Sequence, residues 1–464
     1  MTIKEKILLV HPEISHKKQT FQGVIENEPV ELEYYMAMLK EEGYEVEIFD
    51  VSREKITLKE KVKQMHPDYF YICGRLKQEN FMKNYLRFVK QFDKKIVTIV
   101  SGLHVQKNAE RFFMPEVDYI LTTFDIFTIL PLLKFEKEKK GCAGKRVPDS
   151  FSEINGLCYR KDGYWLSNPQ KPFDINRLPM PDRSYFYEHP DHYCYLDMRK
   201  CAQVRTAYSC AFHCNFCYRN TMNCGTYTAR DIELVVEEIA GIDCDNIYII
   251  DDDFLLDKVR IKRFIELIRE RRIHKHYVCY GRADFIVKNK ALMKELKSIG
   301  FRYVITGIEA TTNRALKNYN KKTDMNVNVE CIRFMQEIGI NCVVMLITDL
   351  DFRAKDFREM YNFVRDLNVR HMAVSIYTPI PGTELYEQYK DKLLTDNPEN
   401  FDYMHLVTAP RRMGIRQYYF HYYLMITRMF LLSYKRGVYD FLDYKEYLWY
   451  AIRSAIVSRG MKDM

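Results

Sequence analysis

Three cysteines lie within eight residues of this chain. Cys210, Cys214 and Cys217 are separated by three and then two residues, in the stretch SCAFHCNFCYRN. Thiolates are the soft ligands that select iron–sulfur clusters and zinc. With 13 cysteines in 464 residues, chance would produce this spacing only about 0.01 times. The triplet therefore predicts a metal site.

Zinc and simple burial of the thiols are the alternatives to an iron–sulfur cluster. Structural zinc usually has four ligands arranged as two CxxC pairs, and no fourth cysteine or pair of histidines stands at a suitable spacing. Three cysteines leave one iron of a cubane cluster without a protein ligand, and an open iron can bind a substrate or cofactor. The spacing favours a cluster.

Charged side chains follow three predicted strands, at 246–250, 276–281 and 301–307. These side chains are Asp251, Asp252, Asp253, Arg282, Asp284, Glu309 and Lys321. Taken singly, each acid has a simpler explanation, because it could cap the next helix or pair with a lysine. In order, at successive strand ends, they predict one binding site at the carboxyl edge of a β/α barrel.

The cysteine spacing, with an aromatic residue beside the last cysteine, resembles the radical S-adenosylmethionine (radical SAM) superfamily. The three aspartates with Phe254 resemble that family's DDxF strand end, and GRAD at 281–284 resembles its third-strand sequence. TGIEA, followed by NYNKKT, resembles its GxE…K stretch, and YTPIPGTELY a later turn. One departure is LITDLDFRAKD after the fifth strand, where relatives usually have a Gly/Pro turn.

The resemblance implies a [4Fe–4S] cluster whose open iron chelates the amino and carboxylate groups of S-adenosylmethionine. One electron then cleaves the sulfonium, and a 5′-deoxyadenosyl radical abstracts hydrogen from the substrate. The residues that the resemblance assigns to this cosubstrate are Asp252, Asp253, Arg282, Glu309 and Lys321. It also implies an external one-electron reductant, such as flavodoxin or ferredoxin.

Two alternations of strands and helices divide the chain. Five β-α units over residues 1–140 predict a doubly wound, Rossmann-like parallel sheet. Residues 141–200 are rich in Pro, Gly and Asp and predict a linker with a hairpin. Six β/α units over 201–390 predict an open, partial (β/α)6 TIM-like barrel. Residues 391–464 are predicted to form a helical, basic and aromatic extension. The alternatives for its long helix are packing in the core, covering the substrate and contacting a membrane.

The first alternation resembles the cobalamin-binding domain that is fused to many radical SAM enzymes. KILLVHP, HPDYFYICG, IVSGLH and VDYILTTFD match it in order, although VSGLH and TTFD replace commoner turns; neither GxGxxG nor a P-loop is present. The resemblance places Arg75, Ser101, Gly102 and His104 near cobalamin, whereas the simpler explanation of the last three is an ordinary tight turn. Because D-x-H-x-x-G is absent, we expect base-off cobalamin with no histidine ligand.

The charge pattern and the lengths of the apolar runs limit the partners that we expect for this protein. The net charge is +8, but the lysines and arginines are scattered among acids, so no nucleic-acid partner is expected. No signal-peptide layout and no run of about 20 apolar residues is present, which predicts a cytoplasmic protein with reduced thiols and no transmembrane segment. The expected substrate is a small or lipid-like molecule.

The leading hypothesis is a cobalamin-dependent radical SAM methyltransferase acting on an unactivated carbon, or less often phosphorus. One S-adenosylmethionine would methylate cobalt, and a second would supply the radical. The alternative within the family is a cyclisation, ring contraction or other rearrangement without methyl transfer. From another class comes a non-catalytic iron–sulfur or corrinoid-binding sensor, which the missing fourth ligand disfavours. No catalytic side chain is assigned.

Overall fold

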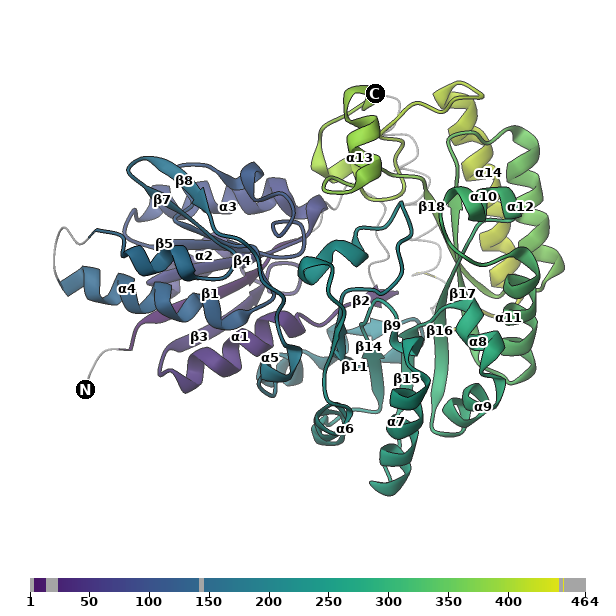
Figure 1. The fold of residues 1–464 in the computed structure, drawn as a ribbon, viewed down its shortest axis with the longest axis horizontal. Coiled ribbons are helices and arrows are strands. Elements are labelled where there is room, and N and C mark those ends of the chain that lie inside the picture. Colours follow the sequence, from purple (N-terminus) through teal and green to yellow (C-terminus); the bar gives the residue numbers. More distant parts are fainter. Residues whose placement is uncertain (1–3, 14–23, 142–145, 442–444, 446–464) are drawn as a thin grey trace.

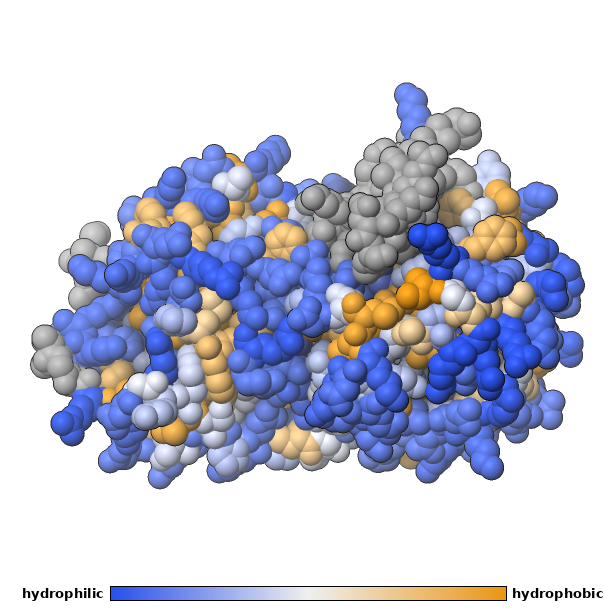
Figure 2. Space-filling model, turned by 90° about the horizontal axis from the view of Figure 1, so that it is seen from above, coloured by the Kyte–Doolittle hydropathy of each residue, from blue (hydrophilic) through white to orange (hydrophobic). Residues whose placement is uncertain are grey.

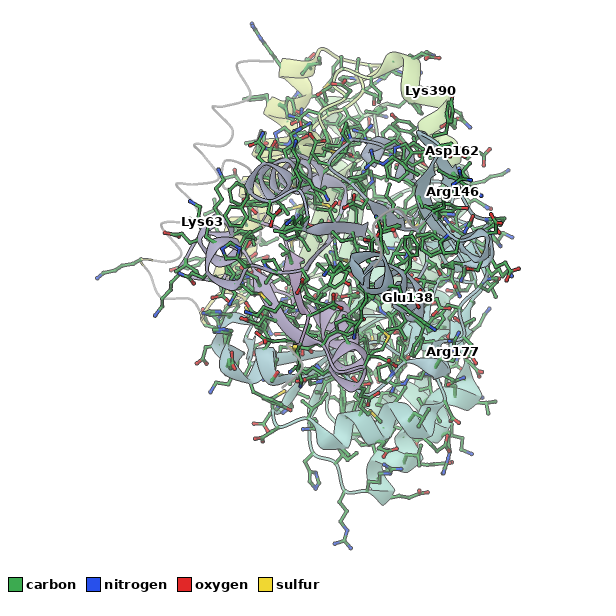
Figure 3. The ribbon with its side chains drawn as sticks, turned by 90° about the vertical axis from the view of Figure 1, so that its left-hand side faces the viewer. Lys63, Glu138, Arg146, Asp162, Arg177 and Lys390 are labelled. Atoms are coloured by element: carbon green, nitrogen blue, oxygen red, sulfur yellow. The ribbon has the colours of Figure 1, made fainter. Side chains whose placement is uncertain are left out.

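The structure is a computed structural model, and it describes residues 4–13, 24–141, 146–441 and 445. It has two lobes, each built around a twisted parallel sheet (Figure 1). Charged side chains such as Lys63, Glu138 and Asp162 lie on the outside of the molecule (Figure 3). The face shown in Figure 2 is mostly hydrophilic, with small hydrophobic groups between the charged ones.

The N-terminal lobe contains a seven-stranded sheet of order β3-β1-β4-β5-β6-β7-β8. The first five of these strands are parallel, β7 adds antiparallel to β6, and β8 adds antiparallel to β7. The strands are β1 Lys6–His11, β3 Glu45–Asp50, β4 Tyr69–Cys73, β5 Val97–Ser101, β6 Tyr119–Leu121, β7 Leu157–Lys161 and β8 Tyr164–Ser167. The expected hairpin of the linker region is therefore part of this sheet.

Helices cover both faces of that sheet. They are α1 Val30–Glu41, α2 Leu58–Met65, α3 Glu79–Phe92 and α4 Ile129–Gly141. In β1, Ile7 and Leu9 belong to one buried cluster with residues of α1 and α4, while Leu8 and Val10 belong to another with residues of α2 and α3. A strand that is apolar throughout is buried on both faces, which confirms the doubly wound prediction.

The second lobe is an arc of six parallel strands in the order β11-β14-β15-β16-β17-β18, with no pairing between the first and the last. The strands are β11 Cys201–Val204, β14 Asn246–Ile249, β15 His276–Tyr280, β16 Phe301–Glu309, β17 Asn341–Thr348 and β18 His371–Ile376. The helices are α6 Ile232–Gly241, α7 Lys258–Glu270, α8 Ala283–Lys288, α9 Lys290–Ser298, α10 Asn313–Asn318, α11 Met325–Glu337 and α12 Ala354–Asp366. The partial, open barrel is confirmed.

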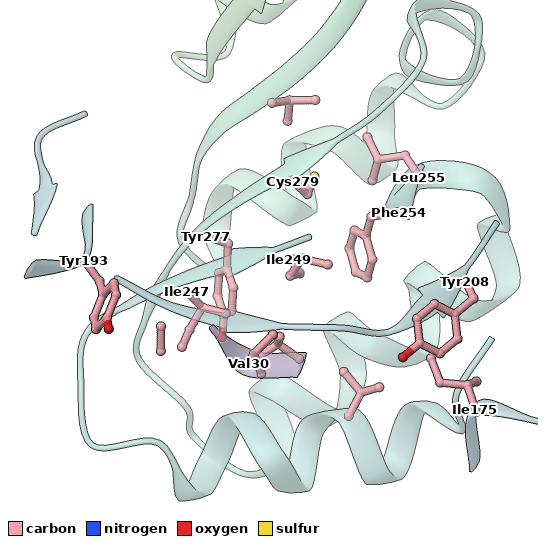
Figure 4. Packing of buried hydrophobic residues seen from close by; sticks show 14 of the residues in the cluster. Val30, Ile175, Tyr193, Tyr208, Ile247, Ile249, Phe254, Leu255, Tyr277 and Cys279 are labelled. Carbon is pink, nitrogen blue, oxygen red and sulfur yellow. The ribbon is translucent and has the colours of Figure 1, made fainter. Parts of the chain in front are cut away.

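Short elements join the lobes. A three-stranded sheet pairs β2 Ile25–Glu26 and β10 Met198–Arg199 with the strand between them, β9 Cys194–Tyr195. Helix α5 Ser184–Glu188 precedes it, and β12 Ala207–Tyr208 pairs with β13 Thr228–Ala229. One buried cluster includes Val30 of α1 together with Ile175, Tyr208 and Ile247, so the core continues from one lobe into the other (Figure 4).

After β18 come α13 Glu384–Tyr389, a loop, and the long helix α14 Ile415–Lys435. Tyr418 and Tyr422 of α14 are fully buried, and their hydroxyl groups donate to Thr348 Oγ1 at 2.8 Å and to the Val374 carbonyl at 2.9 Å. The inner face of α14 therefore packs on the barrel. The helical prediction for residues 442–444 and 446–464 lies outside the described residues. Among the helices that are described, none is long and apolar enough to cross a membrane.

Candidate active site

The three cysteines lie on one loop that follows β12. Cys214 is buried, while Cys210 and Cys217 are half-buried. Burial raises the pKa of Cys210 to about 11 and that of Cys217 to about 12, and nearby acidic groups, chiefly Asp252 and Asp253, act in the same direction. Thiols of this kind deprotonate when they bind metal. Three soft donors on one half-buried loop fit an iron–sulfur cluster, although no three Cys, His, Asp or Glu side chains among the described residues are already arranged as a metal site.

Contacts from the barrel hold this loop in place. The Asn215 side chain donates to the Asn318 carbonyl at 2.6 Å, and the Asn320 side chain donates to the His213 carbonyl at 2.7 Å. On the other side, the guanidinium carbon of Arg282 lies 3.7 Å from the ring centroid of Phe212. The loop is therefore fixed both to the C-terminal end of α10 with the segment after it and to the residues that follow β15.

The three consecutive aspartates after β14 have different environments. Asp251 accepts hydrogen bonds from the backbone of Thr206 at 2.7 Å and of Ala207 at 2.9 Å, so it anchors the chain after β11. Asp252 pairs with Arg219 at 3.2 Å. Asp253 is buried, and neither of its carboxylate oxygens has a partner among the described residues.

Asp253 faces two cations that do not neutralise it fully. Burial raises its pKa to about 7, although the charges of Arg282 and Lys321 act in the opposite direction. Arg282 donates to Asp284 Oδ1 at 2.9 Å and to the Lys321 carbonyl at 2.8 Å. An unpartnered buried carboxylate among cations is a candidate binding group.

Glu309 and Lys321 form a buried ion pair at the end of β16, with 3.0 Å between Oε1 and Nζ. The register of β16 shifts between Gly307 and Glu309, and Glu309 has a left-handed φ of 63°. A Cβ on Gly307 would lie 2.2 Å from Glu309 Oε1 and 2.6 Å from Lys321 Nζ. The glycine leaves room for the pair. The structure thus brings Asp253, Arg282, Glu309 and Lys321 together, while Asp252 is turned to Arg219.

The predicted cobalamin residues lie at the carboxyl ends of β4 and β5. Gly102 has a φ of 118°, and a Cβ there would lie 2.4 Å from the Gly74 carbonyl oxygen. The Gly74 N–H donates to the Ser101 carbonyl at 3.3 Å, and Arg75 is exposed beside them. The two glycine loops are thus in direct backbone contact and are buried at these strand ends.

His104 has a different environment from the one expected. Its ring is buried, with Nε2 2.7 Å from Glu79 Oε2 and Nδ1 3.3 Å from the Asn108 amide. Arg111 also contacts Glu79, at 2.5 Å, and these side-chain bonds outweigh burial and lower the pKa of Glu79 to about 2. Both ring nitrogens therefore already have protein partners, Glu79 and Asn108. The contact between His104 and cobalamin stays a prediction.

Several interlobe residues were not found from the sequence. Arg205 pairs with Glu31 of α1 at 2.8 Å, and Tyr208 stacks on Phe124 with 4.0 Å between ring centroids. Tyr403 has a left-handed φ of 66° and is 42% exposed, yet burial raises its pKa, as does Tyr218 of the cysteine loop. Arg205, Glu31, Tyr208 and Tyr403 lie outside the motifs quoted above, so no local signal identifies them.

Comparison with known proteins identifies the second lobe. The family model of the radical SAM superfamily matches residues 204–364, which include the three cysteines, Asp253, Arg282, Glu309 and Lys321. Residues 204–364 form a radical SAM domain. The domain implies a [4Fe–4S] cluster and S-adenosylmethionine as cofactors, and it makes the chain an enzyme.

Relatives extend the likeness beyond this domain. A hopanoid C-3 methylase of Methylococcus capsulatus is 27% identical over 219 residues, which are 47% of this chain and 42% of the methylase. An anaerobic magnesium-protoporphyrin IX monomethyl ester cyclase of Rubrivivax gelatinosus is 24% identical over 430 residues, which are 88% of this chain and 74% of the cyclase. The chain thus spans less than half the length of the first relative and about three quarters of the second.

A solved structure shares the whole fold. The cobalamin-dependent S-adenosylmethionine radical enzyme OxsB, with aqua-cobalamin and S-adenosylmethionine bound, superposes with a TM-score of 0.72 at 15% identity. The match covers 93% of this chain and 72% of OxsB. At this identity the likeness establishes the arrangement of a doubly wound sheet before a radical SAM barrel.

Proposed function

We propose that this radical SAM protein is a cobalamin-dependent methyltransferase that acts on an unactivated carbon or, less often, phosphorus. One observation carries the proposal: Asp253, Arg282, Glu309 and Lys321 gather beside the three-cysteine loop. When bound, the cluster with S-adenosylmethionine supplies a hydrogen-abstracting radical, and cobalamin supplies the methyl group. An external one-electron reductant, such as flavodoxin or ferredoxin, serves the cluster.

In this proposal each charged residue seats one part of S-adenosylmethionine. Asp253 receives the ammonium group, because it is an acceptor with both oxygens free. Arg282 orients the loop through Phe212, and Lys321 with Glu309 offers one cation and one acceptor for the carboxylate and ribose. Binding replaces water around these groups and strengthens each contact.

The N-terminal lobe would hold cobalamin against the barrel. Ser101, Gly102 and Gly74 are buried where the ends of β4 and β5 meet, and the exposed Arg75 directly follows Gly74 in the chain. OxsB, which has this fold, is described with aqua-cobalamin bound. Base-off binding without a histidine ligand agrees with the engagement of His104 by Glu79 and Asn108.

A second reaction has specific support. The cyclase of Rubrivivax gelatinosus aligns over 88% of this chain, whereas the methylase aligns over 47%. Cyclisation or another rearrangement without methyl transfer is therefore the alternative reaction. Methylation adds one CH2 unit to the product and releases S-adenosylhomocysteine, and rearrangement does neither.

The experiment uses the anaerobically reconstituted full chain with S-adenosylmethionine, cobalamin and a strong chemical reductant. We expect 5′-deoxyadenosine, and a retained corrinoid in the ultraviolet–visible spectrum. Cys210→Ala, Cys214→Ala and Cys217→Ala each remove the product, whereas Cys224→Ala, an exposed cysteine outside the triplet, leaves it unchanged. Absence of 5′-deoxyadenosine from the wild type contradicts the radical function. Its formation without corrinoid retention contradicts only the cobalamin assignment.

A further inference from the structure

A basic face lies next to the cysteine loop. Arg314, Lys317 and Lys322 are exposed and form no ion pair among the described residues. The segment 311–323 contains no acidic residue, and neither does the loop 210–220. No acid within either segment balances the positive charge of this face. We call the surface made by Arg314, Lys317 and Lys322 the basic face.

A hollow of about 400 Å³ opens within the basic face. Its lining residues are Asn313, Lys317, Asn320, Lys322, Thr323 and Asp324. The one acid among them, Asp324, caps α11 by accepting from the backbone of Asn326 at 2.8 Å and of Val327 at 3.0 Å. The Thr323 hydroxyl is buried without a partner among the described residues. The hollow thus offers the cations Lys317 and Lys322 to an acidic group.

The basic face and the cysteine loop are neighbours in direct contact. Asn320, which lines the hollow, donates to the His213 carbonyl at 2.7 Å. The rings of Phe216 and Tyr319 are 5.4 Å apart. Ala211 and His213 of the loop are themselves exposed. The basic face therefore adjoins the loop that carries the three thiols.

We infer that the basic face is the docking surface for an acidic one-electron carrier protein of the flavodoxin or ferredoxin kind. The inference rests on the proposed radical function, since only a reducible centre at the three cysteines needs such a carrier. One electron leaves the carrier, which is oxidised, and reduces the centre; no atom or proton is transferred. Opposite charges across such an interface steer association and raise its rate, and salt weakens both effects.

Direct binding tests the surface without any turnover. Oxidised flavodoxin is titrated into the reconstituted full chain at low salt. In the test variant Arg314→Glu/Lys317→Glu, two exposed cations of α10 are reversed; the control Lys258→Glu/Lys262→Glu makes the same change of charge on exposed positions of α7. We expect the affinity to fall at least tenfold in the test variant and less than twofold in the control. Equal affinities for the two variants would overturn the inference.

The rate of 5′-deoxyadenosine formation supplies the second readout. With reduced flavodoxin, the test variant should be at least tenfold slower than the control; with dithionite and methyl viologen, both should match the wild type. Loss of the same size with both donors would mean damage to the site and would overturn the docking assignment. A wild type that is inactive even with dithionite refutes the proposed function, while the titration still judges whether an acidic carrier binds here. The milder Lys317→Ala should show a smaller loss in the same direction.

Discussion

Asp253 is a buried carboxyl group without a hydrogen-bond partner among the described residues. Its two oxygens are buried and unpaired among the described residues, and its pKa is raised to about 7 because burial outweighs the attraction of Arg282 and Lys321. Such a group is costly while it waits for a ligand. Stability given up at a binding site is recovered when a cation occupies it.

Asp253→Asn should therefore stabilise the chain and impair ligand binding. Below pH 4 both states carry a neutral Asp253, so the substitution changes little. Between pH 4 and 7 the unfolded state ionises while the native state stays neutral, and the penalty grows with pH. At pH 8 we expect the variant to gain roughly 2–4 kcal/mol in free energy of unfolding, measured by urea denaturation, while equilibrium titration shows weaker binding of S-adenosylmethionine. If the variant gained the same free energy of unfolding at pH 4 and at pH 8, the raised pKa of Asp253 would be the wrong explanation.

Gly307 has a steric role that its neighbours define. A methyl group there would lie 2.2 Å from Glu309 Oε1 and 2.6 Å from Lys321 Nζ, so Gly307→Ala must displace the buried ion pair. We expect S-adenosylmethionine to bind at least tenfold more weakly and the free energy of unfolding to fall by about 1–3 kcal/mol. The control is Gly241→Ala at the end of α6, where nothing lies within 4 Å. Binding by Gly307→Ala at the wild-type affinity would show that the pair does not serve the ligand.

At the scale of elements, the site depends on how the cysteine loop meets β15. The Arg282 guanidinium lies over Phe212, a contact worth about 0.5–2 kcal/mol. Phe212→Leu keeps all three thiols, so iron content should stay near that of the wild type. S-adenosylmethionine should bind roughly 3- to 30-fold more weakly, because Arg282 loses its support. Phe216→Leu, on the outer side of the loop against Tyr319, is the control and should change binding less.

Iron analysis and equilibrium titration separate the two roles of that loop. If Phe212→Leu lost as much iron as Cys217→Ala, the ring would be positioning the thiols, and the support of Arg282 would be the wrong explanation.

Elements were more predictable than the contacts between them. Alternating apolar strands and helices predicted both parallel sheets, because strands such as KILLVH are buried on both faces. The positions of Asp253, Arg282 and Glu309 followed from the rule that strand ends meet at one edge of a sheet. Arg205, Glu31 and Tyr403 could not be found in this way. They meet only when the lobes pack, and no periodicity encodes that packing.

At the scale of the whole molecule, the lobes form one packed unit. Asn80 of α3 donates to Glu399 at 3.0 Å, and the Asn108 side chain donates to the Pro381 carbonyl at 3.4 Å. With the shared core around Val30 and Ile247, these contacts fix the spacing between the glycine loops and the cysteine loop. A reaction that passes a group between two cofactors needs such a fixed separation.

Arg183 is the centre of this joint. It is buried in the connection between the lobes, pairs with Glu28 and, at 2.6 Å, with Glu238, and donates to the Gln203 carbonyl at 2.7 Å. Glu33 lies 3.7 Å away, and its pKa is raised because it is buried and close to Glu28. Removing the arginine leaves carboxylates facing one another in the interior.

Arg183→Gln should therefore lower the free energy of unfolding by about 3–5 kcal/mol at pH 7, the cost of breaking a buried ion pair. The loss should shrink below pH 5, as the stranded carboxylates take up protons. The control is Arg269→Gln, whose pair with Glu295 at 2.9 Å is about half exposed and worth about 0–1 kcal/mol. Urea denaturation at both pH values measures the difference. Equal losses for the two variants at pH 7 would show that the joint is held by apolar packing alone, with the buried charges adding no net stability.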